Sequence, residues 1–114
     1  MTAPALRPFV LQTVWVLALF DLPTETKPQR RDYARFRKDL LEDGFTMMQH
    51  SVYQRHCASG ENAEVHMQRM GRLVPPEGEV RFMTITDKQY GKIVTYWGKN
   101  RRPQPASPAQ LEFF

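Results

Sequence analysis

The chain has 114 residues, of which 41% are hydrophobic and 25% charged, and it carries a formal net charge of +4. This size and composition predict one globular domain and exclude a disordered or fibrous chain. The longest apolar run, Val14 to Phe20, is too short for a transmembrane helix, which needs about 20 residues. The excess of basic over acidic residues weakly favours an anionic partner such as nucleic acid.

The first predicted strand covers residues 14–20, after an irregular leader at 1–13. Every side chain from Val14 to Phe20 is apolar, which predicts a strand buried on both faces in the middle of a sheet. Asp21 follows directly, so the end of this strand carries a carboxylate. Because ligands tend to bind at the ends of buried strands in open sheets, Asp21 is the first candidate functional residue.

A helix is predicted from Thr26 to about Asp43. Thr26 and Gln29 have the spacing of a capping box, and Gly44 is suited to end the helix. Basic side chains outnumber the acids of this helix, which fits contacts to a phosphate backbone; a solvated face paired with acids is the alternative. The basic residues are Arg30, Arg31, Arg35, Arg37 and Lys38.

Residues 45–57 have the composition of extended structure, and a turn at 49–51 would divide them into a hairpin. A second helix is predicted at about 61–74, then strands at 80–86 and 93–97. The proline-rich basic segment 98–108 is typical of a linker. The segment 109–114 ends in two phenylalanines, which predicts a C-terminal strand docked on its own subunit or on a partner subunit.

This order of elements is βαββαβ, the pattern of an α+β ferredoxin-like fold, here with additional C-terminal strands. Periodicity alone does not decide whether 45–57 is one strand or two, but this fold requires two. Cys57 is the single cysteine and cannot form an internal disulfide, which predicts a reducing compartment and hence the cytoplasm. No membrane association is expected.

Several local patterns occur together between residues 14 and 97. An apolar strand ends in Phe20-Asp21-Leu-Pro, a basic helix closes on Gly44-Phe45, and the segments MQHSVYQ and VRFMTITDKQY follow. At these spacings the chain resembles the small ferredoxin-like adaptation subunit of CRISPR systems, the CRISPR-associated endoribonuclease family. The family's motif positions fall on Phe20, Asp21, Arg30, Arg31, Gln49, Ser51, Val52 and Tyr53.

The resemblance implies a symmetric homodimer whose sheets pack face to face, with a divalent cation such as Mg²⁺ between two copies of Asp21. It implies a role in spacer acquisition, bridging dimers of the CRISPR integrase on duplex DNA, and metal-dependent cleavage of RNA or DNA. Phe20, Gln49, Ser51 and Tyr53 would support Asp21. The family often has Tyr where this chain has Phe20, so no phenolic role is expected there.

The chemistry of these residues agrees with that expectation only if the chain dimerises. One Asp21 supplies one ligand, whereas Mg²⁺ usually takes one or two carboxylates, and a twofold axis would supply the second. A turn-forming or helix-capping role is the alternative for Asp21. The candidate nucleic-acid contacts are Arg30, Arg31, Arg35, Lys38, Arg101 and Arg102.

Two other functions stay open from the sequence. One is a toxin-like ribonuclease related to virulence-associated protein D, which would share the fold and the acid but act alone. The other is a non-catalytic RNA-binding or regulatory module on the same fold. This last alternative predicts stacking aromatic side chains exposed on a sheet face and no dependence on magnesium.

Overall fold

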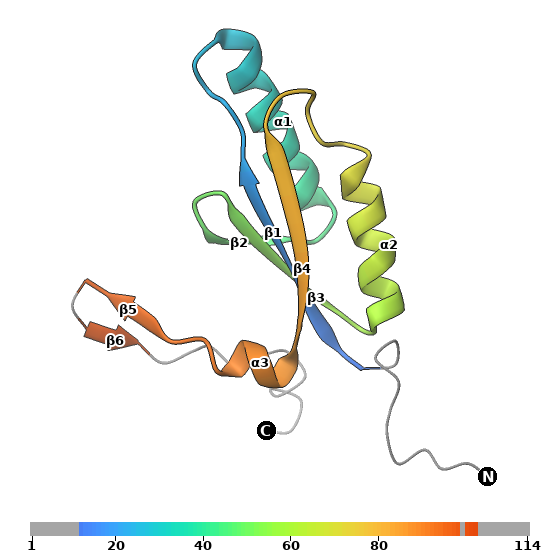
Figure 1. The fold of residues 1–114 in the computed structure, drawn as a ribbon, viewed down its shortest axis with the longest axis vertical. Coiled ribbons are helices and arrows are strands. Elements are labelled where there is room, and N and C mark those ends of the chain that lie inside the picture. Colours follow the sequence, from blue (N-terminus) through green and yellow to red (C-terminus); the bar gives the residue numbers. More distant parts are fainter. Residues whose placement is uncertain (1–11, 99, 103–114) are drawn as a thin grey trace.

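The computed structural model describes residues 12–98 and the backbone of 100–102. A four-stranded antiparallel sheet in the order β2-β3-β1-β4 is packed against two long helices, and a small hairpin follows at the C-terminal side (Figure 1). The ferredoxin-like fold class predicted from the sequence is confirmed. The elements are β1 (Val14–Asp21), α1 (Lys27–Glu42), β2 (Thr46–Gln49), β3 (Val52–Cys57), α2 (Gly60–Gly71), β4 (Glu79–Thr86), α3 (Asp87–Gly91), β5 (Thr95–Trp97) and β6 (Asn100–Arg102).

Strand β1 is central, because it pairs with β3 on one side and with β4 on the other. Its residues from Val14 to Ala18 are buried, as the apolar run predicts, and Asp21 at its end is exposed. Alternate side chains point to opposite faces of a strand. Those on one face join the core under α1 and α2: Val14, Val16, Ala18, Phe20, Phe36, Leu40, Ala63 and Met70.

The other face of the sheet, called here the open face, carries the remaining side chains of β1. Trp15 lies at one end of this face, where its ring stacks on Tyr90 of α3 with centroids 3.9 Å apart. Leu17 and Leu19 follow along the strand, and Asp21 ends it. The buried aromatic stack therefore lies at one end of β1 and the exposed carboxylate at the other.

Both ends of α1 follow from the sequence. Thr26 and Gln29 form the capping box, and Gly44 follows the helix with a φ of 97°. Segment 45–57 is a hairpin of two strands, as the fold requires, and Ser51 in its turn has a φ of 65°. The backbone N–H of Phe20 donates to the Ser51 carbonyl at 3.0 Å, which joins this turn to the end of β1.

Three elements differ from the expectations. Helix α2 ends at Gly71 instead of near Val74, because the Leu73 N–H already bonds to Met70, three residues back, and Pro75 disfavours a helical conformation at Val74. Helix α3 was not expected, because five residues are too few to show a helical period. Within the expected linker, Asn100–Arg102 form β6 and pair antiparallel with β5.

The leader at 1–11, the rest of the linker at 103–108 and the expected docking strand at 109–114 lie outside the described residues. Among the helices that the structure describes, none has the length and apolar character required to cross a membrane.

Candidate metal and nucleic-acid site

Asp21 lies at the end of β1 on the open face, and its side chain is exposed. Directly across the β1–β4 ladder is Glu79, so the two acids lie on the same face of neighbouring strands. Glu79 accepts a hydrogen bond from Arg81 Nε at 3.1 Å through one of its two carboxylate oxygens. Glu79 was not predicted as a site residue, because the register between β1 and β4 cannot be read from the sequence.

The backbone around Asp21 is closely packed. Gly78 has a φ of 93°, and a Cβ atom there would lie 2.6 Å from the Asp21 carbonyl oxygen and 2.9 Å from Leu22 and Pro23. Glycine is therefore required both by its backbone conformation and by the space available. The turn before β4 and the end of β1 hold each other in place at the candidate site.

Arg30 orders the loop that follows Asp21. Its Nη1 donates to the carbonyl oxygens of Thr24 at 3.2 Å and of Glu25 at 2.9 Å. These two bonds tie the first turn of α1 to the β1–α1 loop. The structure thus gives Arg30 a positioning role, in addition to the nucleic-acid contact that the sequence predicts.

The four expected supporting residues lie at the same end of the sheet but contact different groups. Phe20 is buried, and its ring lies 5.6 Å from that of Tyr53, centroid to centroid. Ser51 supplies the carbonyl that binds the Phe20 N–H, and Gln49 is exposed at the end of β2. Tyr53 and Ser51 thus contact Phe20, next to the acid, whereas Gln49 pairs with Val52 of β3. The contacts in the described part of the chain do not join the side chains of the four residues to the carboxylate.

Two residues near this end were missed by sequence reasoning. The Tyr33 hydroxyl lies 3.4 Å from His50 Nε2 and 3.4 Å from Ser51 Oγ, and the Tyr33 ring packs edge-on against Phe20. The phenol absent at position 20 is thus present nearby on α1. No local signal could have paired Tyr33 with His50, because they come from different elements.

The basic residues of α1 do not act as one group. At 100° per residue, Arg31 and Lys38 project from the side of the helix opposite the buried Phe36 and Leu40, and both are exposed. Arg35 forms an ion pair with Asp32 at 3.6 Å, but its side chain is 73% exposed, so the pair adds little stability. We call Arg31 and Lys38, with Lys27 in the first turn, the basic ridge.

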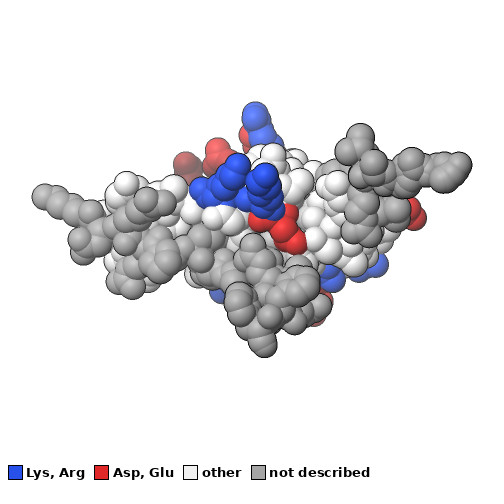
Figure 2. Space-filling view, turned by 90° about the horizontal axis from the view of Figure 1, so that it is seen from below, with Lys and Arg blue, Asp and Glu red and all other residues white. Residues whose placement is uncertain are grey.

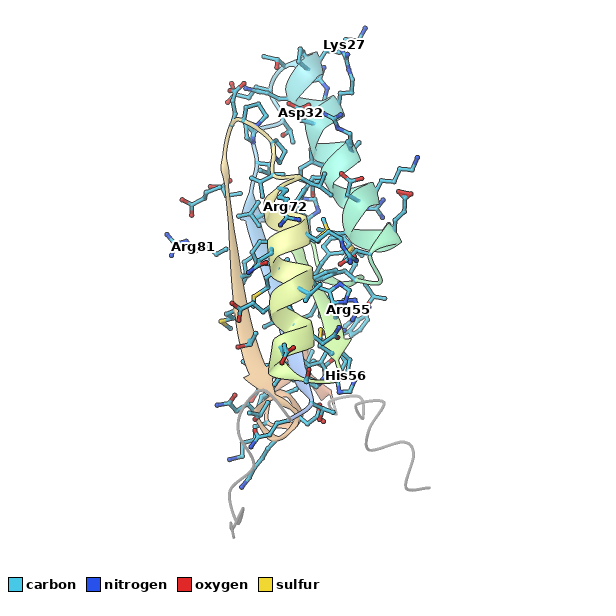
Figure 3. All side chains as sticks on the ribbon, turned by 90° about the vertical axis from the view of Figure 1, so that its right-hand side faces the viewer. Lys27, Asp32, Arg55, His56, Arg72 and Arg81 are labelled. Carbon is cyan, nitrogen blue, oxygen red and sulfur yellow. The ribbon has the colours of Figure 1, made fainter. Side chains whose placement is uncertain are left out.

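Two views show how charges are distributed elsewhere. Figure 2 looks at the end of the molecule that is lowest in Figure 1. A small group of basic side chains lies there beside acidic ones, and the described residues of this view do not form a continuous basic surface. Lys27 is at the start of α1, and Arg81 and Arg55 project on opposite sides of the sheet (Figure 3). For Arg101 and Arg102 the structure describes only the backbone, in β6.

Aromatic side chains do not form an exposed stacking platform on the described part of the sheet. Trp15 and Tyr90, which lie on or over the open face, are 7% and 4% exposed and stack on each other. The exposed aromatics Tyr96 and Trp97 belong to β5, outside the main sheet. This arrangement argues against the alternative of a sheet-face RNA-binding module.

A single copy does not form a complete metal site. Within residues 12–98, no three side chains of His, Cys, Asp or Glu are grouped so that they could hold a metal ion. Asp21 and Glu79 together supply two carboxylates. Of their four oxygens, Glu79 Oε1 is the one that accepts the hydrogen bond from Arg81. Any metal site at this position needs ligands from outside the described chain, such as water, substrate or a second copy.

The fold and the acid at the end of its central strand define a small ferredoxin-like α+β protein with a candidate acidic site. Residues 14–93 match the family model described as CRISPR associated protein Cas2, and the chain belongs to this family. This confirms the resemblance that the sequence motifs predicted.

Curated relatives cover most of the chain. It is 67% identical over 101 residues to the CRISPR-associated endoribonuclease Cas2 of Parvibaculum lavamentivorans, a match that spans 89% of this chain and 100% of that protein. Proteins of the same name from Flavobacterium psychrophilum and Paracidovorax avenae are 47% and 36% identical. These matches span 90% and 89% of this chain, and 90% and 94% of the respective relatives.

Proposed function

We propose that this protein is a CRISPR adaptation subunit that binds duplex DNA, bridges dimers of the integrase during spacer acquisition, and has metal-dependent phosphodiester endonuclease activity at Asp21. Family membership and the name endoribonuclease carried by its relatives support the general class of activity. The same membership favours adaptation over the toxin-like alternative. The single observation that supports the site is the exposed carboxylate at the end of the central strand, on the face that the two long helices leave uncovered.

The open face favours a symmetric homodimer. Met83 of β4 lies directly across from Leu17 in the ladder and is 49% exposed, and Arg81 lies across from Leu19. Two copies packed with these faces together would remove apolar surface from water. Asp21 is at the edge of the same face, and a twofold axis that passes between the sheets close to this end of β1 would bring two copies of Asp21 toward each other.

The acids present suit a hard divalent cation. Mg²⁺ prefers oxygen ligands and commonly keeps several waters beside one or two carboxylates. Asp21 from each subunit would be the protein ligand, and the neighbouring Glu79 offers a further carboxylate oxygen. When bound, the metal would activate water and neutralise charge on a phosphodiester. The chain itself holds Asp21 in place, through the close contact with Gly78 and the loop bonds of Arg30.

The basic ridge would contact the nucleic-acid backbone. Its side chains are exposed, and α1 begins six residues after Asp21, so Lys27 lies near the end of β1 that carries the acid, and Arg31 and Lys38 extend the ridge along the helix. Contacts of lysine and arginine with phosphates give affinity and salt dependence without sequence preference. That behaviour suits a protein that handles DNA of arbitrary sequence.

The Asp21→Asn variant tests the metal site, with Asp32→Asn as the matched control. Asp32 is an aspartate in the first half of α1, and it forms an ion pair with Arg35 of the same helix. We expect Asp21→Asn to lose Mg²⁺ or Mn²⁺ binding in calorimetry together with RNA or DNA cleavage, and Asp32→Asn to retain both. Cleavage by Asp21→Asn at the rate of the unaltered protein would refute the proposed site. Lost cleavage with retained spacer insertion would make the architectural role the principal one.

A further inference from the structure

The four strands of the main sheet contain two arginines and no lysine, and the arginines are Arg55 of β3 and Arg81 of β4. The strand ladders place them on opposite faces. Arg55 lies across from the core residue Val16, so it is on the face that the helices cover. Arg81 lies across from Leu19 and is therefore on the open face, where Asp21 ends β1. Figure 3 shows the two arginines on opposite sides of the sheet.

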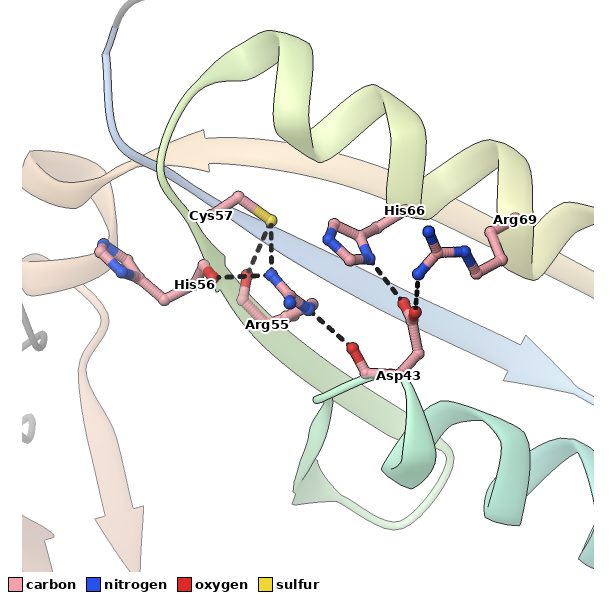
Figure 4. Close-up of polar contacts among 6 residues, drawn as sticks. All are labelled: Asp43, Arg55, His56, Cys57, His66 and Arg69. Atoms are coloured by element: carbon pink, nitrogen blue, oxygen red, sulfur yellow. Dashed lines mark hydrogen bonds and ion pairs between the residues drawn. The ribbon is translucent and has the colours of Figure 1, made fainter.

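The fold itself accounts for Arg55. Its Nε donates to the Asp43 carbonyl oxygen at 2.8 Å, and its Nη1 donates to the His56 carbonyl oxygen at 3.2 Å and to Cys57 Sγ at 3.6 Å (Figure 4). These bonds join β3 to the residue that caps the end of α1. Arg55 is therefore a structural residue on the helix-covered face, and Arg81 is the one arginine that the strands of the main sheet present on the open face.

Arg81 makes a single polar contact in the described part of the chain. Its Nε donates to Glu79 Oε1 at 3.1 Å, and the side chains of the two residues are 78% and 63% exposed. An ion pair with this much exposure adds little stability. The contact uses the N–H on Nε, so the donors on Nη1 and Nη2 remain available to a ligand.

The guanidinium of Arg81 belongs to the same corner of the open face as the acids of the candidate metal site. Glu79 is directly across from Asp21, and Arg81 is the diagonal neighbour of Asp21 on this face. The Cβ atoms of such neighbours are about 7–8 Å apart, within reach of a long side chain. The bond to Glu79 directs the Arg81 side chain toward the end of the strand that carries Asp21. Because β4 is the outer strand of the described sheet, Arg81 also lies nearer the rim of the face than Leu19 does.

A bound divalent cation would reverse the charge of this corner. Without a metal, two carboxylates outweigh one guanidinium, and the excess of negative charge repels a phosphodiester. With a divalent cation on the carboxylates, the excess becomes positive. A Glu79 oxygen that binds the cation would no longer be needed by Arg81, whose planar fork of donors matches the oxygens of a phosphate group.

We propose that Arg81 is a metal-dependent substrate-binding residue of the candidate site. In the metal-free protein it holds Glu79, and once a cation binds Glu79 its guanidinium binds the phosphodiester beside Asp21. The proposal rests on the proposed function, because it takes Asp21 as a metal ligand, and it adds the residue that binds the substrate. It predicts that removal of Arg81 has opposite effects on the two ligands. The cation loses a repelling neighbour, whereas the phosphodiester loses a binding partner.

The test measures both ligands in the full-length Arg81→Gln variant. Mn²⁺ is titrated by calorimetry, and a short fluorescent RNA is titrated by anisotropy, once with Ca²⁺ and once with EDTA. We expect Mn²⁺ affinity to rise about three- to tenfold at low salt, because a positive charge several ångströms from the cation is removed. RNA affinity in Ca²⁺ should fall at least about fivefold, since a charged hydrogen bond to phosphate is lost. RNA affinity in EDTA should match that of the unaltered protein.

Arg72→Gln is the matched control. Arg72 is an exposed arginine at the end of α2, on the helix-covered side of the sheet (Figure 3). This variant loses the same charge, and we expect it to leave both affinities nearly unchanged. If Arg81→Gln changed neither affinity more than Arg72→Gln does, Arg81 would be only a charged residue on an outer strand, and the proposal would be overturned. A fall in both affinities would also overturn it, because a folding defect moves both in the same direction.

Two further variants separate charge from geometry. Arg81→Lys keeps the charge but loses the planar fork, so Mn²⁺ affinity should stay unchanged while RNA affinity in Ca²⁺ is intermediate. Glu79→Gln keeps an acceptor for Arg81 but removes one carboxylate, so Mn²⁺ affinity should fall while RNA affinity in EDTA rises. If Glu79→Gln bound Mn²⁺ like the unaltered protein, the proposed exchange of Glu79 between Arg81 and the cation would be refuted.

Asp21→Asn distinguishes a failure of this proposal from a failure of the proposed function. Mn²⁺ binding that Asp21→Asn does not weaken would refute the proposed metal site and the role of Arg81 with it. Mn²⁺ binding that depends on Asp21 but responds to Arg81→Gln no more than to Arg72→Gln would refute the role of Arg81 alone.

Discussion

The close approach of Gly78 to the end of β1 makes a sharp prediction for Gly78→Ala. The new Cβ atom would meet the Asp21 carbonyl oxygen at 2.6 Å, whereas ordinary van der Waals contact begins at 3.4 Å. The atom it meets belongs to the backbone of the central strand and cannot rotate away. In addition, alanine is strained at a φ of 93°, by about 1–2 kcal/mol.

Two other glycines separate these two effects. Gly98 also has a positive φ, of 65°, but a Cβ atom there meets nothing within 4 Å, so Gly98→Ala reports backbone strain alone. Gly71, the last residue of α2, has the same open surroundings and no positive φ, so Gly71→Ala should not destabilise the protein. We expect Gly78→Ala to cost about 2–4 kcal/mol, because steric displacement adds to the strain.

Urea unfolding followed by circular dichroism measures all three variants on one scale. For a domain of this size, the loss in Gly78→Ala corresponds to a fall in Tm of roughly 10–25 °C. Because the displaced atoms belong to Asp21, metal affinity should fall even in the folded variant. If Gly78→Ala lost no more stability than Gly98→Ala, the proposed contact between the turn and β1 would be refuted.

Two more predictions follow from the charges and from burial. Replacing both Arg31 and Lys38 with Gln should reduce the slope of log affinity for duplex DNA against log salt concentration by about 1.8. The exposed Lys88 provides the control variant Lys88→Gln. An unchanged slope in the double variant would contradict the role of the basic ridge. Burial raises the pKa of Cys57 in the folded protein above the ordinary thiol pKa of the unfolded chain. The resulting contribution to stability is fully present at a pH below the ordinary thiol pKa, and it is lost as the pH rises through the raised pKa of the folded protein. Iodoacetamide should therefore alkylate the folded protein only at higher pH than the urea-unfolded protein, and coincident pH profiles would show that Cys57 is not buried as described.

Much of the fold could be predicted because its main elements carry strong local signals. The apolar run of β1 and the capping box of α1 are contiguous patterns, and both elements occur where these patterns place them. The capping box Thr86–Gln89 was equally present for α3, but no apolar period follows it. For β6, the basic and proline-rich composition gave no sign of a strand that pairs with β5, and Gly98, which follows β5, has a positive φ.

The candidate site was predictable only where one element supplies it. Asp21 was found because the strand before it identifies its position. Glu79 could not be found, because strand register is fixed by packing and not by any local motif. The position of Arg55 was equally hidden, since its partners include backbone carbonyls, one of them at the end of α1, and carbonyls have no residue-specific signature.

Helix α1 is fixed at both of its ends, which has a consequence for how nucleic acid would lie on the protein. Near its start, Arg30 bonds to the loop after Asp21, and Gln29 Nε2 donates to Glu77 at 3.1 Å. At its end, Asp43 is bonded to β3 through Arg55 and to α2 through His66. The 16 residues of α1 span about 24 Å, the length of roughly seven base pairs of duplex. Because the helix cannot shift independently of the sheet, phosphates held by the basic ridge would keep a constant offset from the carboxylate of Asp21.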